Sequence, residues 1–191
     1  PIECEVVGTL PDGLDGALYR LGGAWYYPPK YPDDVLLHAD GIVSRFRIGG
    51  GRVSYAARYV ETERLKANRE LGRSRFGYYR NRFSDDPDVA DLNAGAANTT
   101  AWAHAGRLLA LKEDSLPYEI DPVTLETRRL CDFGGAIESR TFTAHPKIDG
   151  RTGEMVAFGY QATGNYSGDI HLWTFAPDGS LSHEIRVTMP W

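Results

Sequence analysis

The sequence predicts an all-β protein made of successive antiparallel hairpins, the arrangement of β-propeller blades. Twenty-one glycines and 11 prolines divide the 191 residues into short segments. Most of these segments alternate apolar and polar residues with a period of two, which is typical of strands. Turn signals of the Asp-Gly type separate them. A sandwich or a barrel would give similar spacing, and we favour the propeller.

The first hairpin is expected over residues 41–60. Residues 42–48 alternate, Gly49-Gly50-Gly51 provides a permissive turn, and residues 53–60 alternate back. Further hairpins are expected over residues 99–133, 142–161 and 169–189, with turns that include Ala105-Gly106, Asp121-Pro122 and Asp178-Gly179. We therefore expect residues 1–191 to be part of a single propeller domain.

Residues 61–98 are the exception and are expected to connect two hairpins. Residues 61–82 contain seven basic side chains interleaved with aromatic ones. Such stretches can bind nucleic acid, but in an acidic protein we expect a solvated helix or loop that crosses the blade edges. Residues 81–93 have the composition of a polar surface connector, and we assign them no chemistry.

Composition excludes several classes of function. The formal charge of -5 and the pI near 5.5 leave no global basic field to attract nucleic acid. No apolar run approaches the roughly 20 residues of a membrane span. Cys4 and Cys131 are too few for a disulfide framework, so we expect a cytoplasmic location. The chain begins at Pro1 and ends at Trp191 with neither Met nor a tail, so we expect a part of a longer protein, and a signal peptide upstream would not be visible.

Common nucleophile, phosphate-loop and zinc signatures are absent from the sequence, which leaves metal-binding histidines as candidates. His38-Ala39-Asp40 places an imidazole and a carboxylate two residues apart on an extended chain, as an iron facial triad requires. Asp40-Gly41 also has the composition of an ordinary turn, which we favour. His145 precedes Pro146, which holds the backbone extended. It is either a rigid ligand position or a histidine at a hairpin end.

Several blocks of sequence carry a more specific signal. They are residues 12–20, 39–43, 97–100, 109–113 and 142–153, the last of which contains Thr143-Ala144-His145-Pro146-Lys147-Ile148-Asp149. In order and spacing these blocks resemble a carotenoid cleavage oxygenase across essentially the whole chain. Residues 76–81 and 111–115 most resemble the bacterial lignostilbene dioxygenase branch. The resemblance covers only the N-terminal part of such an enzyme.

This resemblance implies a seven-bladed propeller with a non-haem Fe(II) held by four histidines, and cleavage of an alkene by O2 into two carbonyl products. His145 matches the first ligand, and the other three would lie beyond Trp191. Glu113 matches a glutamate that orients a ligand histidine, which would lie outside this chain. Thr99 matches a position near the open coordination site, although it also suits a strand.

In the lignostilbene branch a tyrosine and a lysine bind the phenolic hydroxyl of the substrate, and they match Tyr79 and Lys112. A lysine in an apolar cavity has a lowered pKa, and beside a tyrosine it can accept or stabilise the phenol proton. Without the resemblance, Lys112 would be interpreted as an exposed strand-end lysine. Alternation would send Lys112 and Glu113 to opposite faces, whereas the resemblance implies that both lie near the central cavity. We therefore expect the strand to end there, where Asp114-Ser115 and Pro117 allow a break in pleating. Leu37 stands where the branch commonly has a phenylalanine against the substrate ring, which leaves ring specificity open.

The resemblance therefore implies an Fe(II)-dependent dioxygenase that cleaves the central C=C bond of 4-hydroxystilbenes into two aromatic aldehydes. Its partners would be a small aromatic alkene and O2, and the choice between monomer and homodimer stays open. One alternative is cleavage of carotenoids or apocarotenoids, in which Lys112 would meet no phenol. Another is a non-catalytic propeller that serves as an interaction module, in which His145 is structural and no iron is bound.

Overall fold

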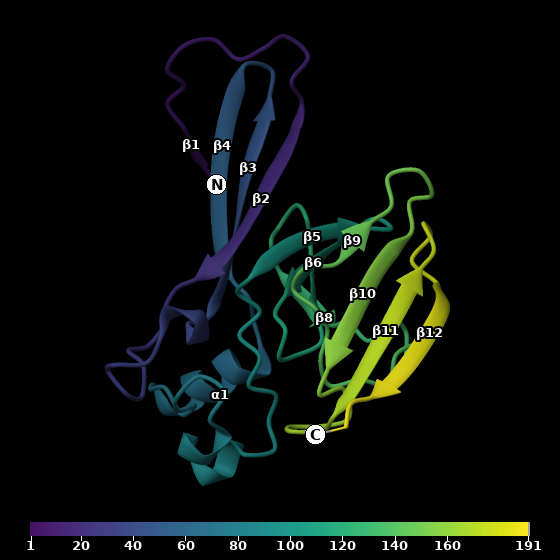
Figure 1. Ribbon diagram of the computed structural model, residues 1–191. Coiled ribbons are helices and arrows are strands. Elements are labelled where there is room, and N and C mark those ends of the chain that lie inside the picture. Colours follow the sequence, from purple (N-terminus) through teal and green to yellow (C-terminus); the bar gives the residue numbers. More distant parts are fainter. Residues whose placement is uncertain (191) are drawn as a thin grey trace.

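Three four-stranded antiparallel sheets follow one another along residues 1–190, the part of the chain that the computed structural model describes (Figure 1). The first has the order β1-β4-β3-β2 and contains β1 (Ile2–Glu3), β2 (Gly16–Gly23), β3 (Gly41–Gly49) and β4 (Arg52–Tyr59). The second runs in chain order through β5 (Thr100–His104), β6 (Arg107–Leu111), β7 (Tyr118–Ile120) and β8 (Thr127–Leu130). The third has the order β12-β11-β10-β9 and contains β9 (Lys147–Ile148), β10 (Met155–Tyr160), β11 (Asp169–Phe175) and β12 (Leu181–Thr188).

Apart from β1, strands that are consecutive in the chain are neighbours in each sheet, as in propeller blades. The predicted all-β fold, with the chain forming part of a propeller, is confirmed. The predicted hairpin over residues 41–60 is formed by β3 and β4, which pair from Ile42 with Tyr59 to Gly49 with Arg52. Gly50 and Gly51 take positive φ angles of 59° and 72° in the turn, a conformation that costs glycine little.

Strand β6 lies between two apolar cores. Because side chains alternate across a strand, Leu109 and Leu111 pack into a core shared with β10 and β11 of the third sheet. Leu108 and Ala110 pack on the other side, in a core that includes Val43 of β3. Each fully buried leucine stabilises the fold by about 2 kcal/mol. The second sheet is thus held on both faces, which fixes the position of the residues that follow β6.

The hairpins expected separately over residues 142–161 and 169–189 are two halves of one sheet. Strand β10 pairs with β11 over its full length, from Met155 with Phe175 to Tyr160 with Ile170. The first of these hairpins is also shorter than expected, because β9 contains only Lys147–Ile148. Pro146 has no N–H to donate to a ladder, so regular pairing cannot continue through it.

The connector over residues 61–98 contains helix α1 (Glu63–Leu71) and two short 3-10 helices, η2 (Arg82–Ser84) and η3 (Pro87–Val89). Helix α1 begins after Thr62, whose Oγ1 accepts a hydrogen bond from the Leu65 N–H at 3.0 Å. The expectation of a solvated helix is wrong for one of its faces, since the side chain of Arg64 is 1% exposed. Its guanidinium lies 5.1 Å from the ring centroid of Phe76, which is also buried.

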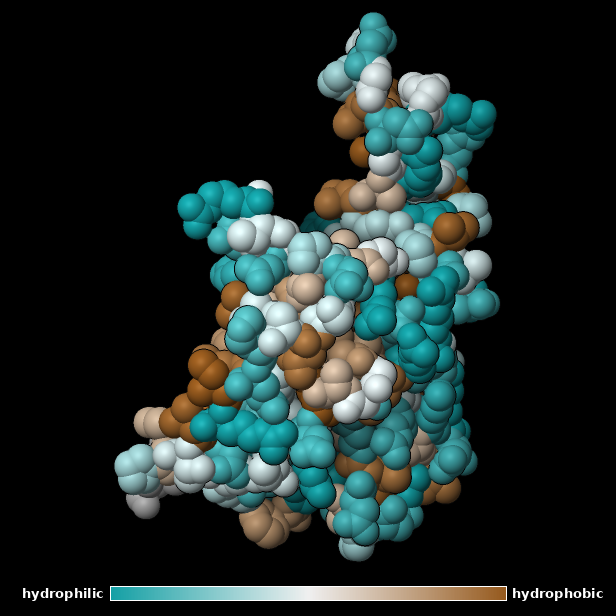
Figure 2. Space-filling model, turned by 90° about the vertical axis from the view of Figure 1, so that its right-hand side faces the viewer, coloured by the Kyte–Doolittle hydropathy of each residue, from teal (hydrophilic) through white to brown (hydrophobic). Residues whose placement is uncertain are grey.

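Figure 1 shows α1 and the connector at the end of the first sheet where the chain also passes into the second sheet. Figure 2 views the side that carries the third sheet and shows apolar side chains among hydrophilic ones. Exposed apolar residues of that sheet include Val156, Phe158, Ile185 and Val187. No helix within residues 1–190 has both the length and the apolar character needed to cross a bilayer.

Candidate functional site

The end of β6 places two of the predicted site residues. The strand ends at Leu111, as expected, and a turn follows. Lys112 is 2% exposed, and its Nζ lies 4.8 Å from the centroid of the Tyr79 ring. An ammonium over an aromatic face is attracted by the negative charge density of the ring. The structure therefore brings together Tyr79 and Lys112, which are far apart in sequence, and Lys112 is not an exposed strand-end lysine.

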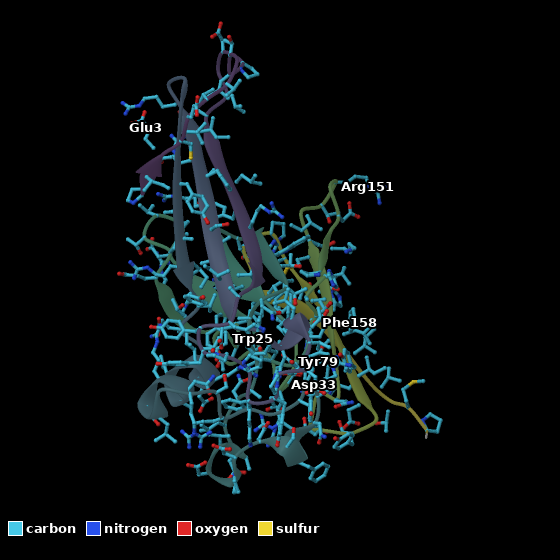
Figure 3. The ribbon with its side chains drawn as sticks, turned by 90° about the vertical axis from the view of Figure 1, so that its left-hand side faces the viewer. Glu3, Trp25, Asp33, Tyr79, Arg151 and Phe158 are labelled. Atoms are coloured by element: carbon cyan, nitrogen blue, oxygen red, sulfur yellow. The ribbon has the colours of Figure 1, made fainter. Side chains whose placement is uncertain are left out.

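Tyr79 comes from the connector and lies beneath the first sheet, near Trp25 and Asp33 (Figure 3). Its amide donates a hydrogen bond to Asp34 Oδ1 at 3.0 Å. Its ring lies 5.8 Å from that of His38, centroid to centroid. The backbone before it is packed closely, because a Cβ on Gly77 would overlap the backbone of Ser84. Tyr79 is thus held by neighbours on both sides.

His145 and Glu113 form a second pair. Glu113 Oε1 lies 3.4 Å from His145 Nε2, and the imidazole is 61% exposed. The structure places Glu113 beside His145, and the role expected for Glu113 towards a histidine outside this chain stays a prediction. The His145 amide donates to Thr143 Oγ1 at 3.0 Å, which fixes the backbone of the block. An imidazole with a carboxylate against one nitrogen is the usual arrangement of a metal ligand and its orienting partner.

Residues 1–190 provide one side chain whose chemistry suits a ligand of iron. Imidazole nitrogen suits Fe(II), so the chemistry of His145 is appropriate. Over those residues, however, no group of three or more His, Cys, Asp or Glu side chains is placed to hold a metal. The chain therefore offers one candidate ligand, with Glu113 beside it.

The pattern His38-Ala39-Asp40 does not form a facial triad. His38 ends a short 3-10 helix, η1 (Leu36–His38), rather than lying on an extended strand. Its Nδ1 lies 2.8 Å from Asp34 Oδ2, and its Nε2 is hydrogen-bonded by Arg64. Asp40 Oδ1 lies 3.6 Å from Arg64 Nε. A guanidinium occupies the position where a shared metal would have to be.

Thr99 and Leu37 are both hydrogen-bonded to the side chain of Asn98. The Thr99 amide donates to the carbonyl of Leu111 at 3.0 Å, which places Thr99 beside the end of β6. Its hydroxyl donates to Asn98 Oδ1 at 3.1 Å, and Asn98 Nδ2 donates to the carbonyl of Leu37 at 2.9 Å. The side chain of Leu37 is 62% exposed. The bond to Leu111 therefore brings Thr99 close to Lys112 in space, and the Leu37 carbonyl is joined to the same region through Asn98.

A cavity of about 590 Å³ lies between the connector and the third sheet. Its lining includes Tyr78, Arg80, Glu113, Asp114 and Tyr160. Tyr79 and Lys112 are not part of this lining, although their neighbours in sequence are. Burial raises the pKa of Asp114, and the nearby charge of Lys112 partly opposes this rise. Arg80 donates a hydrogen bond to the Tyr160 hydroxyl across the cavity.

Sequence reasoning missed the charged residues that surround the site. Asp34 and His38 are four residues apart, a spacing that could have indicated a pair on one helical turn. No local signal marks Arg64 or Asp114, because the charges that act on Arg64 include Asp40, Asp114 and Asp85, from other segments. Burial lowers the pKa of His38 to about 4, and the charge of Arg64 adds to the effect. His38 is therefore neutral at neutral pH.

Comparison with known proteins confirms the expected relationship. Residues 1–191 match the family described as retinal pigment epithelial membrane protein. This chain belongs to that family. This match and the relatives described next confirm the predicted relationship to carotenoid cleavage oxygenases and to their lignostilbene branch.

Several known members of the family are similar to this chain over nearly the whole length of the chain. Resveratrol cleavage oxygenase 1 of Chaetomium globosum is 44% identical over 192 residues, which cover 99% of this chain and 32% of the relative. Lignostilbene-alpha,beta-dioxygenase isozyme III of Sphingomonas paucimobilis is 40% identical, over 100% of this chain and 39% of the relative. The crystal structure of Pseudomonas brassicacearum lignostilbene dioxygenase matches with a TM-score of 0.93 and 45% identity, over 98% of this chain and 39% of that one. The chain thus spans well under half the length of these relatives.

Proposed function

We propose that this protein is an Fe(II)-dependent dioxygenase that cleaves the central C=C bond of 4-hydroxystilbenes with O2 into two aromatic aldehydes. One observation carries the proposal, namely the buried ammonium of Lys112 over the ring of Tyr79. The relatives support the reaction class, because they are named for the cleavage of resveratrol and of lignostilbene. Resveratrol and lignostilbenes are phenolic alkenes, and a phenol is what this pair would recognise.

Lys112 would bind the phenolic oxygen of the substrate. A buried charge is costly unless it is paired or hydrogen-bonded, and the buried Lys112 ammonium lies over the Tyr79 ring and near the charge of Asp114. A phenolic oxygen would satisfy this ammonium. As the phenolic oxygen donates electron density into the alkene, its proton becomes more acidic, and the nearby positive charge of Lys112 favours the ionised form of the phenol. Tyr79 would hold the ring and the hydroxyl against the ammonium.

Iron would be held in part by His145 and would supply the binding and activation of O2, and Glu113 would orient a ligand histidine from outside this chain. Thr99 would border this region, because its amide is bonded to the end of β6 beside Lys112. Leu37 would face the substrate ring in the intact protein. We also propose a cytoplasmic location, since Cys4 and Cys131 are both free thiols.

Cleavage of carotenoids is the second candidate within the family. A hydrocarbon chain offers no hydrogen-bond acceptor to the buried Lys112 ammonium, so the burial of this side chain favours a phenolic substrate. The non-catalytic module has no comparable observation in its favour, because the relatives reported above are named as oxygenases.

The test is aerobic incubation of the intact, Fe(II)-loaded protein with 4-hydroxystilbene, with an apocarotenoid in parallel and the aldehydes measured by mass spectrometry. Two aldehydes from the stilbene alone support the proposal. Lys112→Met should keep bound iron and lose turnover, whereas Lys66→Met, at an exposed lysine of α1, should keep both. Full turnover by Lys112→Met would exclude the role of Lys112, and cleavage of only the apocarotenoid would favour the second candidate.

A further inference from the structure

Tyr79 depends on a side chain from another part of the chain for its position. It lies in a turn that is closed by the Asn81 amide, which donates to the Tyr78 carbonyl at 3.0 Å. The Tyr79 amide donates to Asp34 Oδ1, not to the backbone of a strand. Asp34 precedes Tyr79 by 45 residues. The bond therefore ties the connector to the segment between β2 and β3.

Asp34 is in turn the first member of a buried series of polar contacts, which we call the Asp34–His38–Arg64 relay. Asp34 Oδ2 lies 2.8 Å from His38 Nδ1, and the two side chains are 3% and 6% exposed. Arg64 donates to His38 Nε2. Arg64 also faces Asp40, and both of these side chains are 1% exposed. Water cannot readily replace any of these bonds.

The chemistry of the relay allows only one arrangement of protons. A guanidinium can only donate hydrogen bonds, so His38 Nε2 must accept the one from Arg64. In the neutral ring the proton is then on Nδ1, which donates to Asp34 Oδ2. Asp34 can therefore use Oδ1 to accept the Tyr79 amide. Asp34 Oδ1 also accepts the Val35 amide at 2.9 Å, and a change at His38 reaches Tyr79 through the Asp34 carboxylate.

We propose that His38 is a positioning residue for Tyr79, and that the Asp34–His38–Arg64 relay thereby makes the site selective for substrates with a free phenolic hydroxyl. This proposal rests on the proposed function, because it assumes that Tyr79 and Lys112 receive a phenol. His38 also packs against Tyr79, with an angle of 55° between the ring planes. Its proposed effect on recognition is through the position of the Tyr79 ring.

The test is equilibrium binding to the intact, Fe(II)-loaded protein without O2, so that no turnover occurs. The two probes are 4-hydroxystilbene and 4-methoxystilbene, and the measured quantity is the ratio of their Kd values from the quenching of tryptophan fluorescence. His38→Leu removes both bonds of the ring. His38→Gln keeps one donor for Asp34 and one acceptor for Arg64, so it should rescue.

Asp34→Asn is a second, nearly isosteric variant. If its oxygen accepts from Tyr79, its NH2 faces the Nδ1–H of His38. The other tautomer would instead direct Nε2–H at Arg64, so one bond is lost either way. Asp33→Asn is the matched control, because Asp33 accepts from the Tyr78 hydroxyl and lies outside the relay.

Loss of one buried hydrogen bond is worth about 1 kcal/mol, which corresponds to about a fivefold change in Kd. We expect His38→Leu and Asp34→Asn to lower the preference for the phenol about fivefold or more. We expect His38→Gln and Asp33→Asn to stay within about twofold of the unaltered protein. An unchanged preference in Asp34→Asn and His38→Leu overturns the proposal, as does an equal loss in Asp33→Asn. If His38→Leu does not fold, Asp34→Asn against Asp33→Asn decides.

Tyr79→Phe separates this proposal from the proposed function. If it lowers the preference while the relay variants do not, only the positioning role of His38 fails. If it leaves the preference unchanged, the phenol contact of the proposed function fails, and the positioning role fails with it. The aldehyde assay on the unaltered protein reports the reaction independently of both.

Discussion

His38 should make this protein less stable as the pH falls from about 6.5 towards about 4. The pKa of a histidine side chain is 6.5 without such an environment, and burial together with Arg64 lowers that of His38 to about 4. Between these values the unfolded chain binds a proton that the folded protein does not. Stability therefore rises with pH across this window, and the contribution of neutral His38 is lost as the pH falls.

The size of the effect follows from the two pKa values. One pKa unit is worth about 1.4 kcal/mol, so the gap between 6.5 and about 4 gives about 3 kcal/mol at the acid end. About 2 kcal/mol of this should already be lost at pH 5. The charged groups that face His38 are Arg64, which opposes its protonation, and Asp34, which favours it. A backbone hydrogen bond with Gly77 also favours the protonated form of His38, but burial opposes protonation more strongly.

The assay compares the unaltered intact protein with His38→Gln in urea-induced unfolding at pH 7, 6 and 5, followed by tryptophan fluorescence. All other ionisable groups are common to both proteins and cancel in the difference of unfolding free energies. Relative to His38→Gln, the free energy of unfolding of the unaltered protein should fall by about 2 kcal/mol between pH 7 and pH 5. A difference that stays constant over this range would refute the reasoning, because His38 would then titrate normally in the folded protein.

Three further predictions concern the framework of the site, and the free energy of unfolding measures each. Thr62→Ala should cost about 1 kcal/mol, because the Leu65 amide loses its cap; no change would mean that water replaces the hydroxyl. Leu111→Ala should cost about 2 to 5 kcal/mol, since it opens a cavity in the core shared with the third sheet, and a cost below about 1 kcal/mol would contradict that packing. Gly41→Ala should cost about 3 kcal/mol or more, because its Cβ would lie 2.6 Å from the Ala96 carbonyl oxygen. Gly16→Ala, where nothing lies within 4 Å, is the control and should be nearly neutral.

The strands and turns of this protein could be predicted because they depend on neighbours in sequence. The alternation of residues 42–48 and the two glycines after Gly49 determine the hairpin of β3 and β4. Alternation in β6 likewise decides which leucines face which core. The end of β6 at Leu111 was predicted from the resemblance, which implies that Lys112 and Glu113 both face one cavity, together with the break in pleating that Asp114-Ser115 allows. The family itself was recognisable from short blocks such as residues 142–153, because these combine residue types in a fixed order.

Only the tertiary structure decided which of these pieces meet. The two later hairpins became one sheet because β10 and β11 bury matching faces along their full length. Arg64 belongs to a basic run that has every mark of a solvated segment, and it is buried because the carboxylates of Asp40 and Asp114 come to it from elsewhere in the chain. The contacts of Lys112 with Tyr79 and of Glu113 with His145 also join segments that are distant in sequence. Periodicity records which face of an element is apolar, whereas a charge is buried only where distant segments bring a compensating partner to it.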